Sequence, residues 1–171
     1  MWASKEGIVI SLYDIEKAYP RVCRTALWKL LERWGVCPRF LKICKALHEG
    51  TMVSVKVLGG VSKAYAMERG LREGCPSSPP LFNVYHHAVM LDFRVRRQAQ
   101  AQAQKTTPGL PWEVRVTGAM PGKRLPTGII HSHKCTVGDV EYADDTTILS
   151  RLEEFPRADA LLKQTMLDWE E

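Results

Sequence analysis

The sequence predicts an α+β fold, in which a small antiparallel sheet has helices packed on one face. Two patterns support this prediction: short β-branched apolar runs bounded by polar residues, and longer segments whose apolar residues recur every three or four positions. The chain has 171 residues, of which 45% are hydrophobic and 25% are charged. Such a length and composition suit one globular domain with one core.

Three apolar runs are expected to form the strands of the sheet. Residues 7–13 (GIVISLY) are β-branched and end at Asp14, as in a buried strand that emerges at the edge of a sheet. Residues 134–142 and 146–150 are also apolar and β-branched, and they flank Ala143-Asp144-Asp145. They predict a hairpin with acids at its tip.

A second hairpin is expected around Gly59-Gly60. The flanking residues 51–58 and 61–67 favour β structure, and a two-residue glycine connection is a typical hairpin signal. These residues therefore predict two antiparallel strands.

Four segments have the periodicity of amphipathic helices. Residues 22–34 precede the stop signal Gly35, and a second helix is expected from Pro38 to Gly50. Ser78, Pro79 and Pro80 follow a loop at 70–78 and predict the entrance of a helix over 79–97, because serine caps free N–H groups and proline fits the first turn. Residues 155–171 place apolar side chains on one face and predict the last helix.

The segment 98–126 is expected to be a low-complexity, loop-like insertion. It begins with alternating Gln and Ala and continues with many Pro, Gly and Lys residues. Within it, Val114 and Val116 leave a short strand open as an alternative. The segment is predicted to have few buried apolar contacts.

The charge distribution favours an anionic partner. The formal net charge is +5 with a pI near 9.0, and residues 21–49 alone hold seven basic residues against two acidic ones. Nucleic acid is one such partner, while two solvated helix faces are the simpler explanation.

Cysteine usage and hydropathy bear on the cellular setting. Five scattered cysteines without a CxxC pair argue against a disulfide framework or a zinc ribbon and favour a reducing compartment. His131, His133 and Cys135 alternate along one expected strand and could offer three zinc ligands, but no fourth lies nearby. No apolar run of about 18 residues and no signal peptide pattern is present, so the chain is expected to be intracellular and soluble, without a membrane partner.

Three carboxylates are the candidate catalytic residues. Asp14 follows a strand, and Asp144 and Asp145 lie at a hairpin tip. Magnesium prefers hard oxygen ligands, and a few strand-borne acids that converge on one point are what a two-metal phosphoryl-transfer site requires. The alternative is that these are ordinary turn acids, since Asp is common in turns.

Three ordered blocks resemble the reverse transcriptases of non-LTR retrotransposons and group II introns. The first is ISLYDIEKAY at 10–19, and the second is GLREGCPSSPPLFN at 70–83. The third is YADD at 142–145, which is similar to the family's Tyr/Phe-x-Asp-Asp hairpin. The resemblance covers residues 7–171 apart from 98–126. It implies a partial reverse transcriptase domain over 1–171, a polymerase palm with fingers and thumb largely absent.

The resemblance implies a role for each matching residue. Asp14, Asp144 and Asp145 would be catalytic and would bind two Mg²⁺ ions, with Mn²⁺ as the alternative and the Ile15 carbonyl as an additional ligand. Tyr19 would pack under the sugar and exclude a 2′-hydroxyl, unless it is a core tyrosine. The second block would bind substrate through Arg72, Glu73 and Gly74. The implied partners are an RNA template, a DNA primer and deoxynucleoside triphosphates.

Two positions depart from the family pattern. The family has Gln where this chain has Glu73, and an ionised carboxylate only accepts hydrogen bonds. A negative charge near a triphosphate is unfavourable unless a cation such as Arg72 or Lys17 offsets it. Pro20 stands where the family often has Asp. Neither change removes a metal ligand.

The sequence therefore predicts RNA-templated DNA synthesis, by two-metal nucleotidyl transfer to a primer 3′ end. Two other functions stay open: a catalytically incompetent retrotransposon remnant that acts at most as a nucleic-acid-binding module, and an RNA-templated RNA polymerase. The absence of fingers and thumb favours the first alternative, whereas the intact acids oppose it. Tyr19 and the long second block argue against the second.

Overall fold

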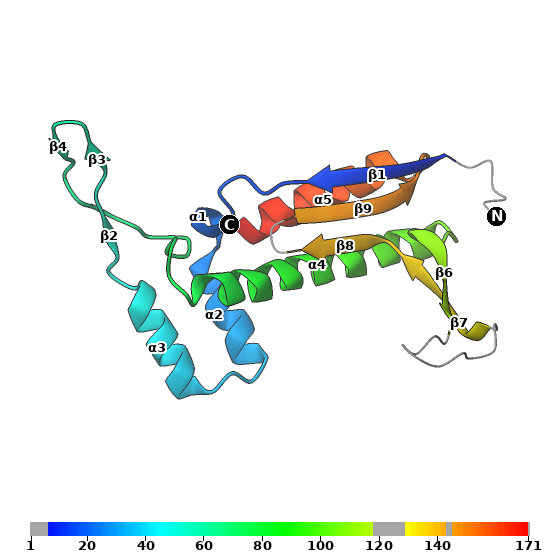
Figure 1. The fold of residues 1–171 in the computed structure, drawn as a ribbon, viewed down its shortest axis with the longest axis horizontal. Coiled ribbons are helices and arrows are strands. Elements are labelled where there is room, and N and C mark those ends of the chain that lie inside the picture. The colour runs from blue at the N-terminus through cyan, green and yellow to red at the C-terminus, as the bar shows by residue number, and fades with distance from the viewer. Residues whose placement is uncertain (1–6, 118–128, 143–144, 171) are drawn as a thin grey trace, which may run out of the picture. The chain divides into compact units, whose positions relative to one another are not determined.

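The computed structural model describes residues 7–117, 129–142 and 145–170 (Figure 1). The chain forms two compact units, which we describe separately. The sheet unit comprises Met1–Asp14 and Val95–Leu161, and the helical unit comprises Ile15–Arg94 and Leu162–Glu171. Within the described ranges the elements are five α-helices and small antiparallel sheets, so the predicted α+β class is confirmed.

The sheet unit contains a three-stranded antiparallel sheet in the order β1-β9-β8. Its strands are β1 (Ile8–Tyr13), β8 (Asp139–Tyr142) and β9 (Asp145–Arg151). β1 pairs with β9 from Ile8 opposite Arg151 to Tyr13 opposite Thr146. The first strand and the acid-bearing hairpin that the sequence predicted are thus neighbours in one sheet.

The two faces of this sheet differ in exposure. On one face, Thr146, Ile148 and Ser150 of β9 are almost completely buried. On the other face, Ile10 and Leu12 of β1 are 61% and 81% exposed. Because side chains alternate along a strand, this pattern marks one covered face and one open face.

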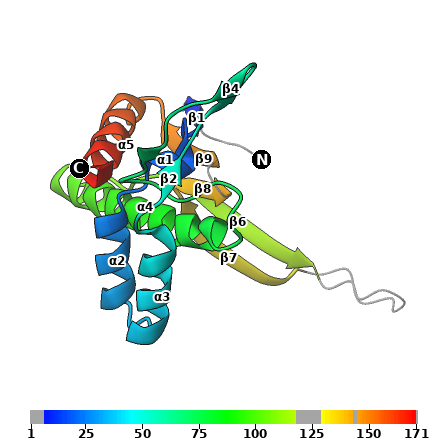
Figure 2. The same ribbon diagram turned by 90° about the vertical axis from the view of Figure 1, so that its left-hand side faces the viewer.

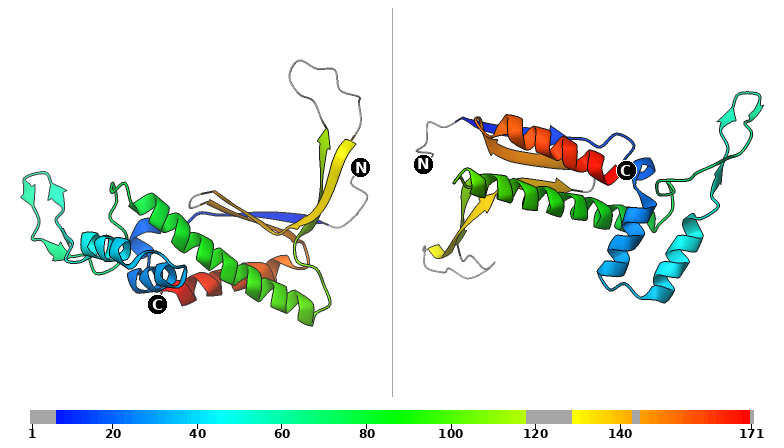
Figure 3. Two further views of the ribbon diagram at one scale, coloured as in Figure 1. Left: turned by 90° about the horizontal axis from the view of Figure 1, so that it is seen from below. Right: turned by 180° about the vertical axis from the view of Figure 1, so that it is seen from behind.

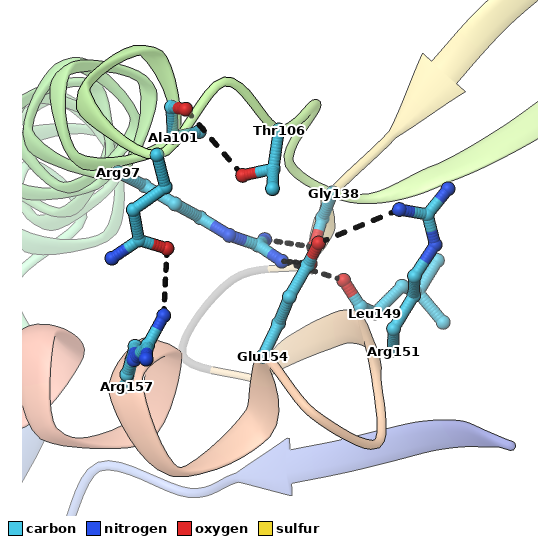
Figure 4. A network of polar contacts seen from close by, with 9 residues as sticks. Arg97, Ala101, Thr106, Gly138, Leu149, Arg151, Glu154 and Arg157 are labelled. Atoms are coloured by element: carbon cyan, nitrogen blue, oxygen red, sulfur yellow. Dashed lines mark hydrogen bonds and ion pairs between the residues drawn. The ribbon is translucent and has the colours of Figure 1, made fainter.

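Arg97 of α4 (Ser78–Ala103) fixes the covered side of the sheet (Figure 4). Its guanidinium donates hydrogen bonds to the carbonyl oxygens of Gly138 and Leu149, each at 3.0 Å, and lies 3.7 Å from a carboxylate oxygen of Glu154. Arg97 is only 7% exposed, and burial lowers its pKa. One side chain thus connects the helix, the start of β8 and the centre of β9.

The loop prediction for 98–126 is wrong over much of its length. Helix α4 continues to Ala103, and Ala101 is buried. Alanine and glutamine are both good helix formers, so the Gln/Ala repeat extends the helix instead of ending it. Residues 118–126 lie outside the described residues.

The alternative strand around Val114 and Val116 is present as β6 (Leu110–Thr117). It pairs with β7 (Ile129–Val137) in a two-stranded antiparallel ribbon (Figure 3). The expected single run 134–142 is therefore divided at Gly138 between the end of β7 and β8.

The helical unit begins with α1 (Ala18–Arg21), α2 (Arg24–Arg33) and α3 (Pro38–His48). α2 and α3 lie side by side as an antiparallel hairpin (Figure 2). The predicted helices at 22–34 and after Pro38 are confirmed. The buried cluster of this unit comprises Ala18, Val22, Leu27, Leu31, Leu41, Leu71, Leu81, Phe82, Tyr85 and Val89.

The end of α5 (Phe155–Glu170) completes the helical unit. Trp169 packs edge-on against Tyr85 at 5.6 Å between ring centroids, and its indole N–H donates to Asp92 at 3.0 Å. The Tyr85 hydroxyl donates to the Trp169 carbonyl at 2.5 Å, and burial raises the pKa of Tyr85 to about 12. These contacts attach the last turns of α5 to α4.

The hairpin around Gly59 is confirmed, with short and interrupted strands. β2 (Met52–Val53) pairs with β5 (Tyr65–Ala66), and β3 (Lys56–Val57) pairs with β4 (Gly60–Val61). Val57 faces Gly60, so the two turn residues are Leu58 and Gly59 instead of the predicted glycine pair. Gly59 has φ +101°, a conformation that favours glycine.

Among the described residues, no helix has the length and apolar character needed to cross a membrane.

Candidate functional site

Two of the three predicted catalytic acids adjoin the β1–β9 ladder at the same end of the three-stranded sheet. Tyr13 is the last paired residue of β1, and it stands opposite Thr146. Asp14 is the residue that follows Tyr13, and Asp145 is the residue that precedes Thr146, so both acids adjoin the last pair of this ladder.

Asp14, just after β1, and Asp145, the first residue of β9, are both exposed. Two hard carboxylates at an open strand end form a donor set that suits Mg²⁺. Within the described ranges, no group of three or more His, Cys, Asp or Glu side chains could hold a metal ion. Asp144, the third predicted acid, lies outside them.

The end of β1 is held in place by Tyr13. Its hydroxyl donates to a carboxylate oxygen of Asp159 in α5, at 2.8 Å. Burial, followed by the hydrogen bond to Asp159, raises the pKa of Tyr13 to about 12. The residue before Asp14 is thus attached to the covered side of the sheet, while Asp14 itself is exposed.

The predicted substrate-binding residues lie in the helical unit. Tyr19 is half-buried in α1 and contacts Phe82 with ring centroids 5.3 Å apart. It also lines an open cavity of about 590 Å³ together with Glu73 and Gly74. Tyr19 therefore packs against the core of its unit and also lines an open cavity.

Backbone hydrogen bonds bring the second block beside Tyr19. The N–H of Leu71 donates to the Tyr19 carbonyl at 2.8 Å, and the N–H of Gly70 donates to the Val22 carbonyl at 3.0 Å. Gly70 has φ +82°, and a Cβ at this position would lie 2.6 Å from the backbone of Pro20. Only glycine permits this close approach, which positions Arg72 and Glu73 next to α1.

A second open cavity, of about 780 Å³, lies on the other side of this loop. Its lining includes Pro20, Arg72 and Glu73, together with Tyr65 of β5 and Arg69. Glu73 therefore lines both cavities. Neither Arg72 nor Lys17 forms an ion pair with Glu73 in the part of the chain that the structure describes.

The turn before α4 differs from the predicted cap. The Ser78 hydroxyl is buried and donates to the Arg72 carbonyl at 2.6 Å, so it holds the 72–78 loop closed instead of capping helix N–H groups. Ser78 is itself the first residue of α4, which places its side chain beside the loop.

Two features of the site were not anticipated from the sequence, namely the backbone conformation of Lys17 and the surroundings of Cys75. Lys17 adopts φ 54°, a left-handed conformation that is rare outside glycine, between Asp14 and Tyr19. Cys75 lines the smaller cavity, and a hydrogen bond of 3.0 Å with the Ser77 hydroxyl lowers the pKa of its thiol. The proximity of Cys and Ser residues in this loop was the sequence signal that could have indicated the surroundings of Cys75.

The three residues that could offer zinc ligands are only partly described by the structure. The side chains of His131 and His133 lie outside the described residues, while Cys135 is an exposed free cysteine. Asp14 belongs to the sheet unit and Tyr19 to the helical unit.

Comparison with known proteins gives one partial similarity. No family model matches the sequence. Over 85 residues, which are 48% of the chain, it is 28% identical to the Transposon TX1 uncharacterized 149 kDa protein of Xenopus laevis. The aligned part is 6% of that protein, so this chain spans a small fraction of its relative. The similarity is thus to part of a transposon protein.

Proposed function

We propose that this chain is the catalytic part of an RNA-directed DNA polymerase, which transfers nucleotides from deoxynucleoside triphosphates to a primer 3′ end with two Mg²⁺ ions. The observation that supports the proposal is the ladder register of β1 and β9, which ends at Tyr13 opposite Thr146, the residues next to Asp14 and Asp145. Asp144, the residue before Asp145, is proposed as the second principal ligand.

The chemistry follows from the requirements of phosphoryl transfer. The primer 3′-oxygen attacks the α-phosphorus, the bond to the β-phosphate breaks, and pyrophosphate leaves. Metal ions held by the carboxylates would stabilise both the attacking and the leaving oxygen, since phosphoryl transfer depends mostly on positioning and charge. Asp14, Asp144 and Asp145 would hold the metal ions, with the Ile15 carbonyl as an additional ligand.

Selection of the incoming nucleotide is assigned to the helical unit. Tyr19 is supported from behind by Phe82 and reaches a cavity that Glu73 and Gly74 also line. A rigid aromatic ring in this setting would exclude a 2′-hydroxyl by contact. The larger cavity with Arg72 offers a cation for phosphate oxygens, which ionised Glu73 would partly oppose.

The metal site can be tested on the chain itself. Titration with Mn²⁺, followed by its electron paramagnetic resonance signal, should show binding that is weakened in Asp14→Asn and in Asp145→Asn. Asp144→Asn should have the larger effect if that residue bridges the ions. Glu49→Gln, an exposed acid at the end of α3, serves as the control. Equal Mn²⁺ binding by all four proteins would exclude the proposed site.

Activity is tested by extension of a DNA primer on an RNA template. The bare chain is expected to show little synthesis, because a misplacement of about 1 Å can cost roughly a hundredfold in rate. A chimera with flanking segments from a complete reverse transcriptase should extend the primer in a magnesium-dependent reaction. Asp14→Asn or Asp144→Asn should abolish this synthesis, and Glu73→Gln should increase it.

The same assay separates the alternatives. Preference for ribonucleotides would favour an RNA polymerase, and Tyr19→Val should relax discrimination against ribonucleotides if Tyr19 selects the sugar. A chimera that retains activity with Asp144→Asn would contradict the assigned site. An inactive chimera whose chain still binds template would leave only the nucleic-acid-binding remnant.

A further inference from the structure

Strand β8, which precedes the proposed metal ligands Asp144 and Asp145, has little of its own to fix its position along β9. It is four residues long, and none of its described side chains is buried, with Val140 52% exposed. A strand without a buried face is weakly specified in register and is prone to slip along its neighbour. The connection Ala143-Asp144 also lacks the glycine or asparagine of tight hairpin turns. The register of β8 therefore needs a contact from outside the hairpin.

β9 is held more firmly than β8. It pairs with β1 from Tyr13 opposite Thr146 to Ile8 opposite Arg151, and its side chains at 146, 148 and 150 are almost completely buried. β8 pairs with β9 only from Asp139 to Tyr142. Burial and pairing thus fix β9, and β8 is the strand whose register is open to change.

Arg97 joins the two strands at the end of the hairpin away from Asp145 (Figure 4). It lies in the part of α4 that belongs to the sheet unit. Its Nη1 donates to the Gly138 carbonyl and its Nη2 to the Leu149 carbonyl, each at 3.0 Å. The N–H of Leu149 donates to the same Gly138 carbonyl at 2.9 Å, so the hydrogen bonding of the two strands reaches Gly138. The guanidinium thus bridges β9 and the residue at which β8 begins.

The bridge distinguishes Gly138 from its neighbours by size. A Cβ at Gly138 would lie 3.1 Å from Nη1 of Arg97, which is a tighter contact than side chains usually make. A slip of β8 by one residue would put Val137 or Asp139 at this position of the ladder, and each carries a Cβ. Gly138 is the only glycine between residues 129 and 142. Arg97 therefore bonds both carbonyls without a close contact only in the observed register.

The guanidinium has little freedom to move away from a slipped strand. Arg97 is 7% exposed, and a carboxylate oxygen of Glu154, between β9 and α5, lies 3.7 Å from Nη2. Movement would break the charge-assisted hydrogen bond to Leu149 and would leave a buried charge less well paired, which is costly. The cost of a slip therefore falls on a buried ionic contact.

We propose that Arg97 is a positioning residue, which sets the register of β8 on β9 through its contacts with Gly138 and Leu149. Because β9 is fixed by β1, a slip of β8 would lengthen or shorten the connection that carries Asp144. The expected effect on metal binding rests on the function proposed above, whereas the register can be measured without any metal.

The register is measured first, by nuclear magnetic resonance on the isotope-labelled full chain. Directly opposed residues of an antiparallel pair bring their backbones close together. The nuclear Overhauser effect between the α-protons of Glu141 and Thr146 therefore reports the register of β8. In Arg97→Met this signal should be lost or joined by signals of slipped registers. The corresponding signal between Leu12 and Thr147 should persist, because β1 and β9 stay paired.

A second variant tests the same contact with the arginine retained. Gly138→Ala should also weaken the observed register, because its Cβ would press on the guanidinium. Gly60→Ala, where a Cβ would meet nothing within 4 Å, is its matched control. Arg157→Met removes an exposed arginine of the same unit and is the control for Arg97→Met. Neither control should change the Glu141 signal.

The effect on the metal site is measured by Mn²⁺ titration with electron paramagnetic resonance. Arg97→Met should raise the dissociation constant for Mn²⁺ by about tenfold or more, as when a support behind a metal ligand is removed. Arg97→Lys, which keeps the charge, should lie between the parent and Arg97→Met. Leu41→Ala removes a buried leucine of α3 and lowers stability without touching β8. It should bind Mn²⁺ like the parent at a temperature at which it is folded.

Three outcomes would overturn the proposal. The first is the parental register in both Arg97→Met and Gly138→Ala. The second is an equal loss of Mn²⁺ affinity in Leu41→Ala and Arg97→Met, which would leave Arg97 a purely stabilising role. The third is a lost register with unchanged Mn²⁺ affinity, which would separate β8 from the metal site. If the parent chain binds no Mn²⁺, the proposed metal site fails, and the Glu141 signal alone decides whether Arg97 sets the register.

Discussion

The helical unit and the sheet unit are stabilised by different kinds of interaction. Large apolar side chains such as Leu27, Leu71 and Phe93 are completely buried in the helical unit. In the described part of the sheet unit, the almost completely buried side chains are Thr146, Ile148 and Ser150, and Arg97 supplies the central polar contacts. The unit that holds the candidate acids therefore depends more on hydrogen bonds and less on apolar burial.

The comparison predicts that local geometry matters most in the helical unit. Gly70→Ala should lower the free energy of unfolding by roughly 3–5 kcal/mol, because its Cβ would meet the Pro20 backbone at 2.6 Å and φ is +82°. Gly35→Ala, with φ +79° in open space, should cost only about 1 kcal/mol. Urea denaturation of both variants measures the difference. Equal costs would show that the contact with Pro20 is not rigid.

In the sheet unit the largest effect is expected at a polar residue. Arg97→Met should cost about 2–4 kcal/mol, because the carbonyls of Gly138 and Leu149 lose their buried donor. Arg157→Met removes an exposed arginine that donates to Gln104, and it should change stability by less than about 0.5 kcal/mol. Hydrogen exchange of β9 amides should increase in Arg97→Met alone. A neutral Arg97→Met would mean that apolar packing also dominates in this unit.

Alkaline pH should weaken both units through one tyrosine each. Burial raises the pKa of Tyr85 and of Tyr13 to about 12, while the unfolded chain loses these protons near pH 10. The stability that each hydroxyl contributes is thus present below pH 10 and lost as pH rises from 10 through 12.

Replacement of these tyrosines measures the two contributions. Tyr85→Phe removes the hydrogen bond to Trp169 and should cost about 1 kcal/mol at neutral pH. It should also make the decline between pH 10 and pH 12 shallower. Tyr13→Phe should do the same to a smaller extent, because Tyr13 is less buried. Thermal melts across this pH range give both slopes, and parallel curves for the variants and the parent would refute the assignment.

The smallest effect concerns reactivity and not stability. A hydrogen bond with Ser77 lowers the pKa of the Cys75 thiol, whereas burial raises that of Cys44. Iodoacetamide at pH 7.5 should therefore modify Cys75 faster than Cys44, as mass spectrometry of the peptides will show. Ser77→Ala should slow the reaction at Cys75 and leave Cys44 unchanged. If Cys44 reacts first, its helix opens more readily than its burial implies.

Hydrophobic periodicity predicted most of the elements because the helices and strands follow it closely. The helices at 22–34, after Pro38 and at 155–171, and the strand at 7–13, correspond to α2, α3, α5 and β1. The prediction was wrong at 98–103, where alternating Gln and Ala were interpreted as low complexity although both residues favour helix. Composition indicated a loop where propensity indicated a helix.

The two units differ in how much of the candidate site could be predicted from the sequence. The acids at strand ends were recognisable from the apolar runs around them, and the paired strands β1 and β9 end next to Asp14 and Asp145. The contact between Gly70 and Pro20 was not predictable, because it joins residues fifty positions apart by backbone geometry alone. Long-range approach of two turns has no periodic signature in the sequence.

The open edge of the three-stranded sheet has a consequence for handling the protein. Among the residues that the structure describes, β1 pairs with β9 alone, and along it Ile8, Ile10 and Leu12 are exposed. Such an edge, with unpaired backbone groups and aliphatic side chains, is a template on which further strands assemble. Concentrated samples are therefore prone to fibrous association, and Ile10→Lys, which adds a charge to the outer strand far from Asp14 along the ladder, is the substitution that should keep the protein dispersed.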